Sequence, residues 1–425
     1  MRVSQICEIF QSKERSRFLE AGQHLVRIAA GGLTIEEIGA LAIAVAESGE
    51  KLNLPEDLSP FADVASTGGP GSLTTLLCPL LVASYGIGVP KLSAPGSIDG
   101  AIDTMSLIPG FKAQLSPEAF AAALRLAGIA HSEQTENFCP ADKAVILIRR
   151  KVNMMANASL AAVSLIGKKL AIPRTRAVFD FRVGPTGNLG ENAEKAIKGA
   201  VLFQRVAAKV GIPIAVTLTD NTSFPSSAVG RLESLHLVWQ ILNGEKLPVE
   251  LDNAHLNACI EIAANACLLA RPEVTLEDSK KRLCALLASG AVAHTFADHL
   301  VAQGAAVADM RSVMDQRAAQ SLVIITSPGS GYWIPPALHE VKDWIKKAQS
   351  FVGGSADTTI DRDPQRQLGI RLLVSPGDKV TQGQPVMQVR CPAGSVIGFG
   401  FDVLKGWTSD RPPGVNRQII QKIGG

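Results

Sequence analysis

The sequence predicts a mixed α/β protein with an additional helical part and a β-rich end. Three observations predict this class. Helical patterns fill the first sixty residues, a strand–helix–strand pattern occupies the centre, and strands and turns dominate from about residue 320 onward. The length of 425 residues is too great for one ordinary domain, but it suits two or three domains with sizeable cores.

The N-terminal region is predicted to be helical. In "LTIEEIGALAIAVAESG", Thr34 and Glu37 have the spacing of a capping box, in which each side chain bonds the backbone of the other residue. Apolar residues then recur every three or four positions, and Gly49 is expected to end the helix. Pro55 and Pro60 mark a linker.

The character of the chain changes after Phe61, where apolar runs alternate with glycine turns. In "SPEAFAAALRLAG", Ser116 is placed to cap a helix, Pro117 lies in its first turn, and Gly128 ends it. The stretch from Cys139 to Ala171 is again expected to be helical, with faces rich in Ser and Ala.

The centre of the chain carries the strand–helix–strand pattern. "RAVFDFRV" and "IPIAVTLT" are predicted strands, and "ENAEKAIKGAVLFQRVAAKVG" between them is a predicted helix. This order predicts two parallel strands in a covered sheet. Two more helical stretches are expected around 232–242 and 256–269.

Composition narrows the function. The formal charge of +3 argues against nucleic acid as the main partner. No apolar run reaches membrane-spanning length, and the N-terminus lacks the apolar core of a signal peptide. The seven cysteines form no CxxC pair, which is typical of reduced thiols in a cytoplasmic protein. We therefore expect a cytoplasmic protein that binds neither nucleic acid nor membrane and uses no metal and no cofactor.

A glycine-rich stretch, "DVASTGGPGSLTT", runs from Asp63 to Thr75. A Ser-Thr-Gly-Gly turn that enters a helix presents backbone N–H groups and the positive end of the helix dipole to one point, which favours an anion. It is not a Walker A loop, because no Gly-Lys-Ser/Thr follows. Such turns usually carry a cation as well, and this stretch contains neither Lys nor Arg.

A second group of residues lies in "LIRRKVNMMANASLAAVSLIGKKL". Ser164 and Lys168 are four residues apart and so share a helix face, and Arg149 lies fifteen residues before Ser164. One interpretation is that these residues lie on a solvent-exposed charged surface, where most Arg and Lys side chains are found. However, Ala, Val, Leu and Ile surround Ser164 and Lys168, and polar groups on so apolar a face need a partner.

Together these motifs make the chain similar to the thymidine and pyrimidine-nucleoside phosphorylases. The similar segments, in order, are "DVASTGGPG", "IDTMSLIPGF", "CPADKAVILIRR", "VSLIGKKL", "DFRVGPTG", "TLTDNTSFPSSAVG" and "GGSADTTIDRD", which span nearly the whole chain. The sequence also distantly resembles anthranilate phosphoribosyltransferase, which has a related glycine turn.

The resemblance implies a small helical domain and a larger α/β domain with a mixed sheet, followed by a C-terminal α+β lobe. Mapped onto this sequence, residues 1–60 with 139–172 form the helical domain, residues 61–138 with 173–330 form the α/β domain, and residues 331–425 form the β-rich lobe. Substrate then lies in the cleft between the first two, and the protein is a homodimer through the helical domain.

The resemblance also implies a site for the pyrimidine. Arg149, Ser164 and Lys168 match the three residues that hold the ring, and Arg149 and Lys168 are the expected catalytic residues. Breaking the C1′–N1 bond leaves negative charge on the departing base, and cations aimed at its oxygens stabilise the transition state more than the ground state. The serine offers a donor and an acceptor to the N3 edge.

The phosphate site departs from the family pattern. Val64 and Ala65 stand where the family has Lys-His, and Ala101 replaces a phosphate-binding Thr. Lys91 is the candidate for a substitute cation. Replacing Val64 with Lys, with Ala65→His beside it, is expected to raise phosphate affinity. The residues expected to bind phosphate are Ser66, Thr67, Gly68, Gly69, Thr75, Ser93 and Lys91.

The expected activity is phosphorolysis of a pyrimidine nucleoside to the free base and (deoxy)ribose 1-phosphate. Because the lysine is missing, two alternatives stay open: transfer of the ribosyl group to water or another acceptor, and pyrimidine binding without catalysis. The sequence does not select among the pyrimidines, between ribose and deoxyribose, or between nucleoside and nucleotide.

Overall fold

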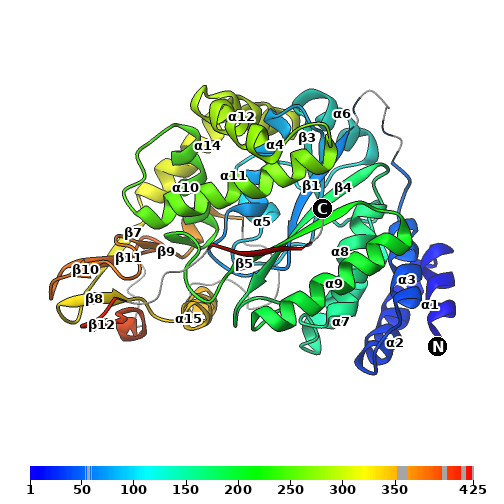
Figure 1. Cartoon of the computed structure of the whole chain (residues 1–425), viewed down its shortest axis with the longest axis horizontal. Helices are drawn as coiled ribbons and strands as arrows, with labels where there is room; N and C mark the ends of the chain where they lie inside the picture. Colours follow the sequence, from blue (N-terminus) through cyan, green and yellow to red (C-terminus); the bar gives the residue numbers. More distant parts are fainter. Residues whose placement is uncertain are drawn as a thin grey trace.

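The computed structural model describes residues 1–52, 54, 58, 60–351, 362–394, 400–412 and 418–423. The expected segment "GGSADTTIDRD" therefore lies outside the described residues, except for its last two positions. Figure 1 shows helices α1, α2 and α3 at one end, a central sheet with helices on both faces, and small sheets at the opposite end.

The central sheet is mixed, which confirms the predicted α/β class. Its strand order is β1 (Phe61–Ser66), β4 (Thr175–Val183), β5 (Ile214–Asp220) and β13 (Ile419–Ile423). The first three strands are parallel, and β13 returns from the end of the chain to pair antiparallel with β5. A second parallel pair, β2 (Val89–Ser93) and β3 (Ile129–Glu133), lies beside β1.

The predicted strand–helix–strand unit is present as β4, α9 (Ala193–Val210) and β5. Helix α6 (Pro117–Ala127) begins at the Ser116 cap and ends at Gly128, whose φ of 68° is left-handed. These local signals predicted the structure well because a cap and its helix lie within a few residues of each other.

Helix α3 (Ile35–Glu47) has the predicted capping box, since Thr34 Oγ1 accepts from the Glu37 N–H and the Thr34 N–H donates to the Glu37 carboxylate. The helix ends where it was predicted to end, with Ser48 as the C-cap and Gly49 directly after it. Gly49 does not, however, adopt the positive φ that is common for a glycine at this position. A Cβ at this position would overlap the carbonyl oxygen of Asn137, so the glycine serves a close approach of two backbones.

Helices α2 (Phe18–Ala30) and α3 pack against α7 (Pro140–Lys151) and α8 (Ala158–Leu170), and α1 (Val3–Gln11) packs against α2 and α3. The lack of a side chain at Gly167 lets α3 and α8 approach closely. A Cβ at this position would lie only 3.0 Å from the Ala42 carbonyl oxygen. A division into a helical domain (1–60 with 139–172), an α/β domain (61–138 with 173–330) and a C-terminal lobe (331–425) remains our proposal.

The two faces of the central sheet belong to different cores. Ala177, Phe179 and Phe181 point toward α8 and α9, whereas Val178 and Val64 pack with the helices on the other side. Those helices, in chain order, are α4 (Thr74–Ser84), α5 (Ala101–Met105), α10 (Arg231–Leu242), α11 (Glu250–Ala270), α12 (Leu276–Ala288), α13 (Ala291–Ala302) and α14 (Val307–Ala318).

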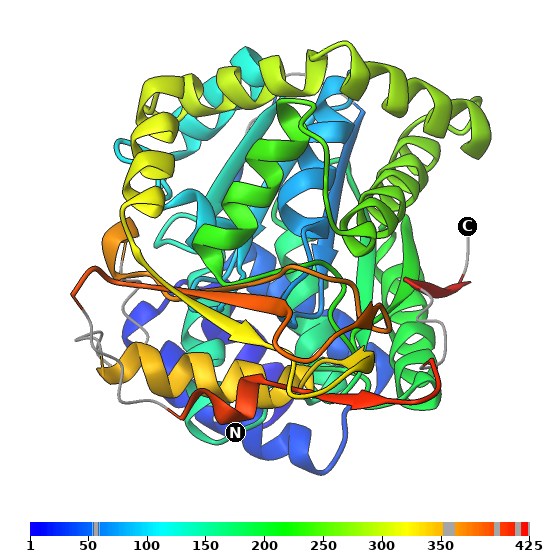
Figure 2. The same cartoon turned by 90° about the vertical axis from the view of Figure 1, so that its left-hand side faces the viewer.

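The C-terminal region contains the expected strands and turns and one helix that was not expected, α15 (Leu338–Phe351). One sheet has the order β6 (Ala228–Val229), β9 (Gly369–Leu372), β11 (Pro385–Cys391), β7 (Ser321–Thr326), and another has the order β10 (Lys379–Val380), β8 (Gly331–Ile334), β12 (Trp407–Ser409). Figure 2 shows these strands crossing in front of the helices. Short 3₁₀ helices occur at Arg15–Arg17, Pro364–Arg366 and Phe401–Leu404.

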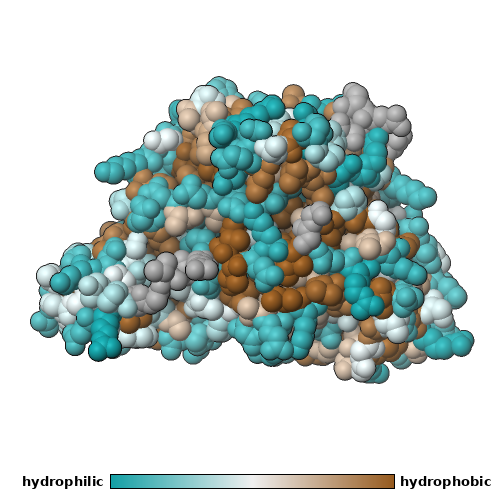
Figure 3. All heavy atoms as spheres, viewed as in Figure 1, coloured by the Kyte–Doolittle hydropathy of each residue, from teal (hydrophilic) through white to brown (hydrophobic). Residues whose placement is uncertain are grey.

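The surface is mostly hydrophilic on the face in Figure 3, with apolar residues gathered near its middle. Within the described residues, no helix taken singly has the length and apolar character needed to cross a membrane. Among these residues, α12 and α13 taken together are long and apolar enough to cross a membrane by length and composition alone, but the two helices are bent by 72° relative to each other.

Candidate active site

One cavity of about 200 Å³ lies between α7 and α8 on one side and the ends of β1 and β2 on the other. It brings nearly all of the predicted site residues to one place. Those that line it are Ser66, Thr67, Gly68, Thr75, Lys91, Ser93, Arg149, Ser164 and Lys168. Gly69 is the exception and does not line the cavity.

The α8 wall of the cavity carries a buried ion pair. Lys168 Nζ lies 2.7 Å from Asp142 Oδ2 and 2.7 Å from Ser164 Oγ, and the Ser164 hydroxyl donates to the same Asp142 oxygen over 2.9 Å. An ammonium has three N–H donors. Two of them have partners among the described residues, which leaves the third for a ligand in the cavity.

Asp142 was not predicted as a site residue, although it belongs to the "CPADK" segment. It lies in the first turn of α7, is 1% exposed, and also accepts from Gln134 Nε2. A signal for it existed in the sequence, because a Ser and a Lys on an apolar helix face require a buried partner. Asp142 is that partner, and it fixes the direction in which Lys168 and Ser164 point.

Arg149 is held by backbone carbonyls. Its guanidinium donates to Met154 O (3.3 Å), Met155 O (2.8 Å) and Leu160 O (3.3 Å). Burial lowers its pKa to about 10, and the charge of Asp142 opposes that shift, so it stays positive at neutral pH. Of its five N–H groups, two have no partner among the described residues and remain for a ligand at the cavity wall.

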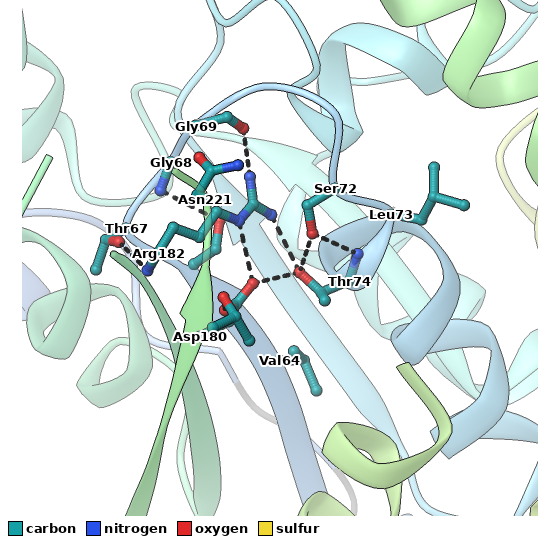
Figure 4. Close-up of polar contacts among 12 residues, drawn as sticks. Val64, Thr67, Gly68, Gly69, Ser72, Leu73, Thr74, Asp180, Arg182 and Asn221 are labelled. Atoms are coloured by element: carbon teal, nitrogen blue, oxygen red, sulfur yellow. Dashed lines mark hydrogen bonds and ion pairs between the residues drawn. The ribbon is translucent and has the colours of Figure 1, made fainter. Parts of the chain in front are cut away.

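The glycine-rich loop does have a cation beside it, contributed by β4 (Figure 4). Arg182 donates from Nε to Asp180 Oδ2 (3.1 Å), from Nη1 to the Gly69 carbonyl (2.5 Å) and from Nη2 to Thr74 Oγ1 (3.0 Å). Gly69 thus supports Arg182 through its carbonyl and does not present its N–H to the cavity. The charge of Arg182 is paired with that of Asp180, so the main effect of this arginine is to hold the loop in its conformation.

Several polar groups of the loop are occupied within the protein. The Thr67 N–H bonds the Asp180 carbonyl, the Gly71 N–H bonds Asp99, and the Leu73 N–H bonds His255 Nε2. Burial raises the pKa of Asp99, and its hydrogen bonds to Gly71, Ser234 and Gly230 oppose that shift. The groups left facing the cavity are mainly the hydroxyls of Ser66 and Thr75, at the start of α4.

Lys91 lines the cavity, but its ammonium is bonded beneath the loop. Nζ lies 3.1 Å from Asp63 Oδ1 and 2.5 Å from the Val64 carbonyl oxygen, and Lys169 bonds the other oxygen of Asp63. Burial lowers the pKa of Lys91, against the effect of Asp63. Burial acts to raise the pKa of Asp63, but the two lysines outweigh it and lower that pKa.

The Asp63–Lys91–Lys169 cluster therefore holds two ammonium groups and one carboxylate, all at most 3% exposed. Within the described part of the chain, no second carboxylate bonds either lysine. With both lysines protonated, this cluster carries one net positive charge below the end of β1.

Val64 does not lie at the cavity. It is fully buried and packs in the core with Leu77, Cys78 and Val178. The burial of Val64 argues against the expected gain in phosphate affinity from Val64→Lys, because the new ammonium would start from an apolar core. The strand alternation of β1 places Ala65, and not Val64, on the cavity side.

Ser93 ends β2 and lies 2.8 Å from His131 Nε2 on β3. Burial lowers the pKa of His131 well below its ordinary value, and the nearby charges of Lys91 and Lys169 lower it further. The neutral imidazole orients the Ser93 hydroxyl at the cavity wall.

Comparison with known proteins defines the class of this site. Residues 58–162, which carry the glycine-rich loop, all of α7 and the start of α8, match the family model described as "Glycosyl transferase family, a/b domain". A crystal structure of anthranilate phosphoribosyltransferase from Thermus thermophilus matches with a TM-score of 0.55 at 17% identity, covering 73% of this chain and 96% of that chain. At this identity the match shows the fold alone. Fold and domain together define a glycosyltransferase-type protein.

The particular relatives are thymidine phosphorylases. The protein of that name from Sinorhizobium fredii (strain NBRC 101917 / NGR234) is 29% identical over 398 residues, which is 92% of this chain and 88% of that protein. Those from Burkholderia cenocepacia (strain J2315 among its designations) and Agrobacterium fabrum (strain C58 / ATCC 33970) are 27% and 26% identical, over 91% and 84% of this chain and 88% and 80% of theirs. The chain is a glycosyltransferase-type enzyme and a homologue of the thymidine phosphorylases along most of its length.

Proposed function

We propose that this protein cleaves the N-glycosidic bond of a pyrimidine nucleoside with phosphate as the acceptor. The products are the free base and a ribose or deoxyribose 1-phosphate. One observation supports this more than any other. A single cavity is lined on one side by Arg149, Ser164 and Lys168, and on the other by the hydroxyls of the glycine-rich loop.

The α7–α8 wall suits the departing base. Its carbonyl oxygens gain negative charge as the C1′–N1 bond breaks, and the free N–H groups of Lys168 and Arg149 offer cationic donors to them. The contacts of Lys168 with Asp142 and of Arg149 with backbone carbonyls hold both cations in place beforehand. Little reorganisation is then needed during the reaction.

The loop wall suits an oxyanion acceptor. Ser66, Thr75 and Ser93 present hydroxyls, and α4 begins at Thr74 with its dipole directed at the same place. The net positive charge of the Asp63–Lys91–Lys169 cluster lies below the loop. We propose that Thr67 and Gly68 complete this wall and that Lys91 contributes through its charge.

A specific observation favours a second candidate. Lys91 and Arg182 are both paired with carboxylates, so neither offers an unpaired cation to phosphate. Transfer of the ribosyl group to water or another acceptor would need no such cation. Binding of a pyrimidine without catalysis is the third outcome to be distinguished.

The test is incubation with thymidine, uridine and cytidine, each with and without phosphate, followed by measurement of base release. Phosphate-dependent release supports phosphorolysis. Equal release in both conditions supports transfer to water and contradicts our proposal. Base binding without release supports a binding protein.

We also propose that the chain works in the cytoplasm as a homodimer through its helical part, as the resemblance implies. Apolar side chains exposed on that part support this: Leu19 is 53% exposed, Leu147 39% and Val152 52%. Sedimentation of the wild type and of a Leu19→Glu, Val152→Glu double variant tests it. A wild-type monomer contradicts the proposal.

A further inference from the structure

Arg150 differs from the other cations of the cavity. Lys91, Lys168 and Arg182 are each paired with a buried aspartate, and Arg149 is bonded by three carbonyls. Arg150 is joined only to the carbonyl oxygen of Pro95, and no carboxylate in the described ranges bonds it. Four of its five N–H groups thus have no protein partner among the described residues.

Arg150 crosses from one wall of the cavity to the other. It belongs to the last turn of α7, whereas Pro95 lies in the loop that follows β2. That loop passes Ser93 and Ser97, and both of these serines and Arg150 line the same cavity. Arg150 therefore lines the same cavity as Ser66, Thr75 and Ser93, whose hydroxyls we assign to phosphate.

The loop is shaped to receive this guanidinium. Gly96 has a φ of 97°, and a Cβ there would lie 2.8 Å from Arg150 Nη1 and 3.1 Å from Nη2. A larger residue would both strain the backbone and push the arginine away. Asp103 accepts from the Gly96 and Ser97 N–H groups and so fixes the loop under Arg150.

Burial lowers the pKa of Arg150, and the charge of Asp103 opposes this shift. An arginine nevertheless stays charged at neutral pH, and burial in a cavity strengthens its attraction for an anion. The planar guanidinium can meet two phosphate oxygens at once, which gives both affinity and orientation.

We propose that Arg150 is the cation that binds inorganic phosphate in this cavity, where the glycine-rich stretch itself contains neither Lys nor Arg. This inference rests on the proposed function. The anion then lies between the loop hydroxyls on one wall and α7 on the other, so phosphate binding holds the two walls together.

The experiment compares the wild type, Arg150→Gln, Arg150→Lys and the control Lys151→Gln. Lys151 is the next residue, is exposed, and does not line the cavity, so its variant removes the same charge without touching the site. Phosphate affinity is measured by calorimetry, and KM values for phosphate and for the nucleoside are measured separately. Thermal unfolding shows that each variant is folded.

We expect Arg150→Gln to weaken phosphate binding about tenfold or more, as for loss of one charge-assisted contact. Arg150→Lys should lose less phosphate affinity than Arg150→Gln. The phosphate affinity of the Lys151→Gln control should stay within about twofold of the wild type, and the KM for the nucleoside should hardly change in any variant. If folded Arg150→Gln binds phosphate as tightly as the wild type, the proposed role of Arg150 is wrong, but the proposed phosphorolysis can still hold. If the wild type releases base at the same rate with and without phosphate, both proposals are wrong.

A nucleoside 5′-monophosphate is the second probe, because its phosphate presents the same chemistry. If Arg150→Gln weakens nucleotide binding but not binding of inorganic phosphate, the arginine serves the substrate and the proposal is wrong. If Arg150→Gln weakens the binding of inorganic phosphate, the proposal is supported.

Discussion

Lys168 and Asp142 form a buried ion pair, with Nζ 2.7 Å from Oδ2 and the two side chains only 4% and 1% exposed. This contact joins α8 to α7 at the wall of the cavity where the pyrimidine is proposed to bind. The same pair therefore serves the stability of the helical part and the orientation of its cation. Its removal is expected to affect both, and the two effects can be separated.

Lys168→Ala is expected to destabilise the protein by about 3–5 kcal/mol, because it leaves Asp142 as an uncompensated buried charge. The double variant Lys168→Met, Asp142→Asn removes both charges at similar volume, so most of that stability should return. Neither variant should bind the pyrimidine. Urea unfolding and calorimetry with thymine measure the two effects.

Thymine binding that survives in the folded double variant would show that Lys168 does not hold the base. Equal stability of Lys168→Ala and the wild type would show that the pair contributes nothing to the fold.

Val64→Lys is expected to destabilise the protein and to leave phosphate affinity unimproved. The side chain is fully buried with Leu77 and Val178, where an ammonium would lack a partner. Val64→Met, which keeps the site apolar, should cost less than about 1.5 kcal/mol. Phosphate titration of both variants checks this. A gain of phosphate affinity in Val64→Lys would mean that the side chain reaches the cavity after all.

Gly69→Ala and Gly211→Ala form a matched pair, since both glycines have positive φ. At Gly211 a Cβ would meet nothing within 4 Å, so only the backbone strain of roughly 1–3 kcal/mol is expected. At Gly69 the Cβ would overlap Asn221 and lie 3.3 Å from the Arg182 side chain.

Gly69→Ala should therefore be less stable than Gly211→Ala and should also lose activity, because the Arg182 contact with the loop is disturbed. Unfolding curves and base-release rates for the two variants provide the comparison. Equal effects on stability and rate would show that the loop tolerates a side chain at residue 69.

Stability should fall as the pH drops below about 6.5. Burial lowers the pKa of His131 well below its ordinary value, and lowers the pKa of His236 and of His299 to about 3. All three are neutral in the native protein, but in the unfolded chain they take up protons near pH 6.5. The unfolded state then binds more protons, and each histidine reduces the free energy of unfolding by up to about 1.4 kcal/mol per pH unit.

The pKa of His255 is shifted in the opposite direction to those of the other three histidines. Burial acts to lower its pKa, but contacts with Cys259 and Gln418 raise it above the ordinary value. Its contribution is fully present below pH 6.5 and is lost as the pH rises through the raised value, so it adds no slope in the acid range. Urea midpoints at about pH 7, 6 and 5 test the account, and a midpoint that does not change across this range would contradict it.

The sequence predicted most of what is local. Caps such as Ser116 and the strand–helix–strand unit depend on neighbours a few residues away, and both were predicted correctly. Ser164 and Lys168 were recognised as a pair for the same reason, since one helical turn separates them. Asp142 was missed because its contact with them arises only when α7 packs on α8.

The anion side depended on tertiary structure that the sequence does not show. Nothing in the neighbourhood of Lys91 indicates that its ammonium bonds Asp63 beneath the loop. Arg182 reaches the loop from β4, more than a hundred residues further along the chain, and Arg150 reaches it from α7. The burial of Val64 in the core, in contrast, follows from strand alternation.

The central claim is that one cavity brings a pyrimidine nucleoside and phosphate together for reaction. Its most direct test is the initial rate of base release from thymidine as a function of phosphate concentration, with the sugar product identified by phosphorus NMR. Our account predicts a rate that rises from zero and saturates with phosphate, and a sugar 1-phosphate formed in equal amount to the free base. A finite rate at zero phosphate, with free sugar as the product, would contradict it.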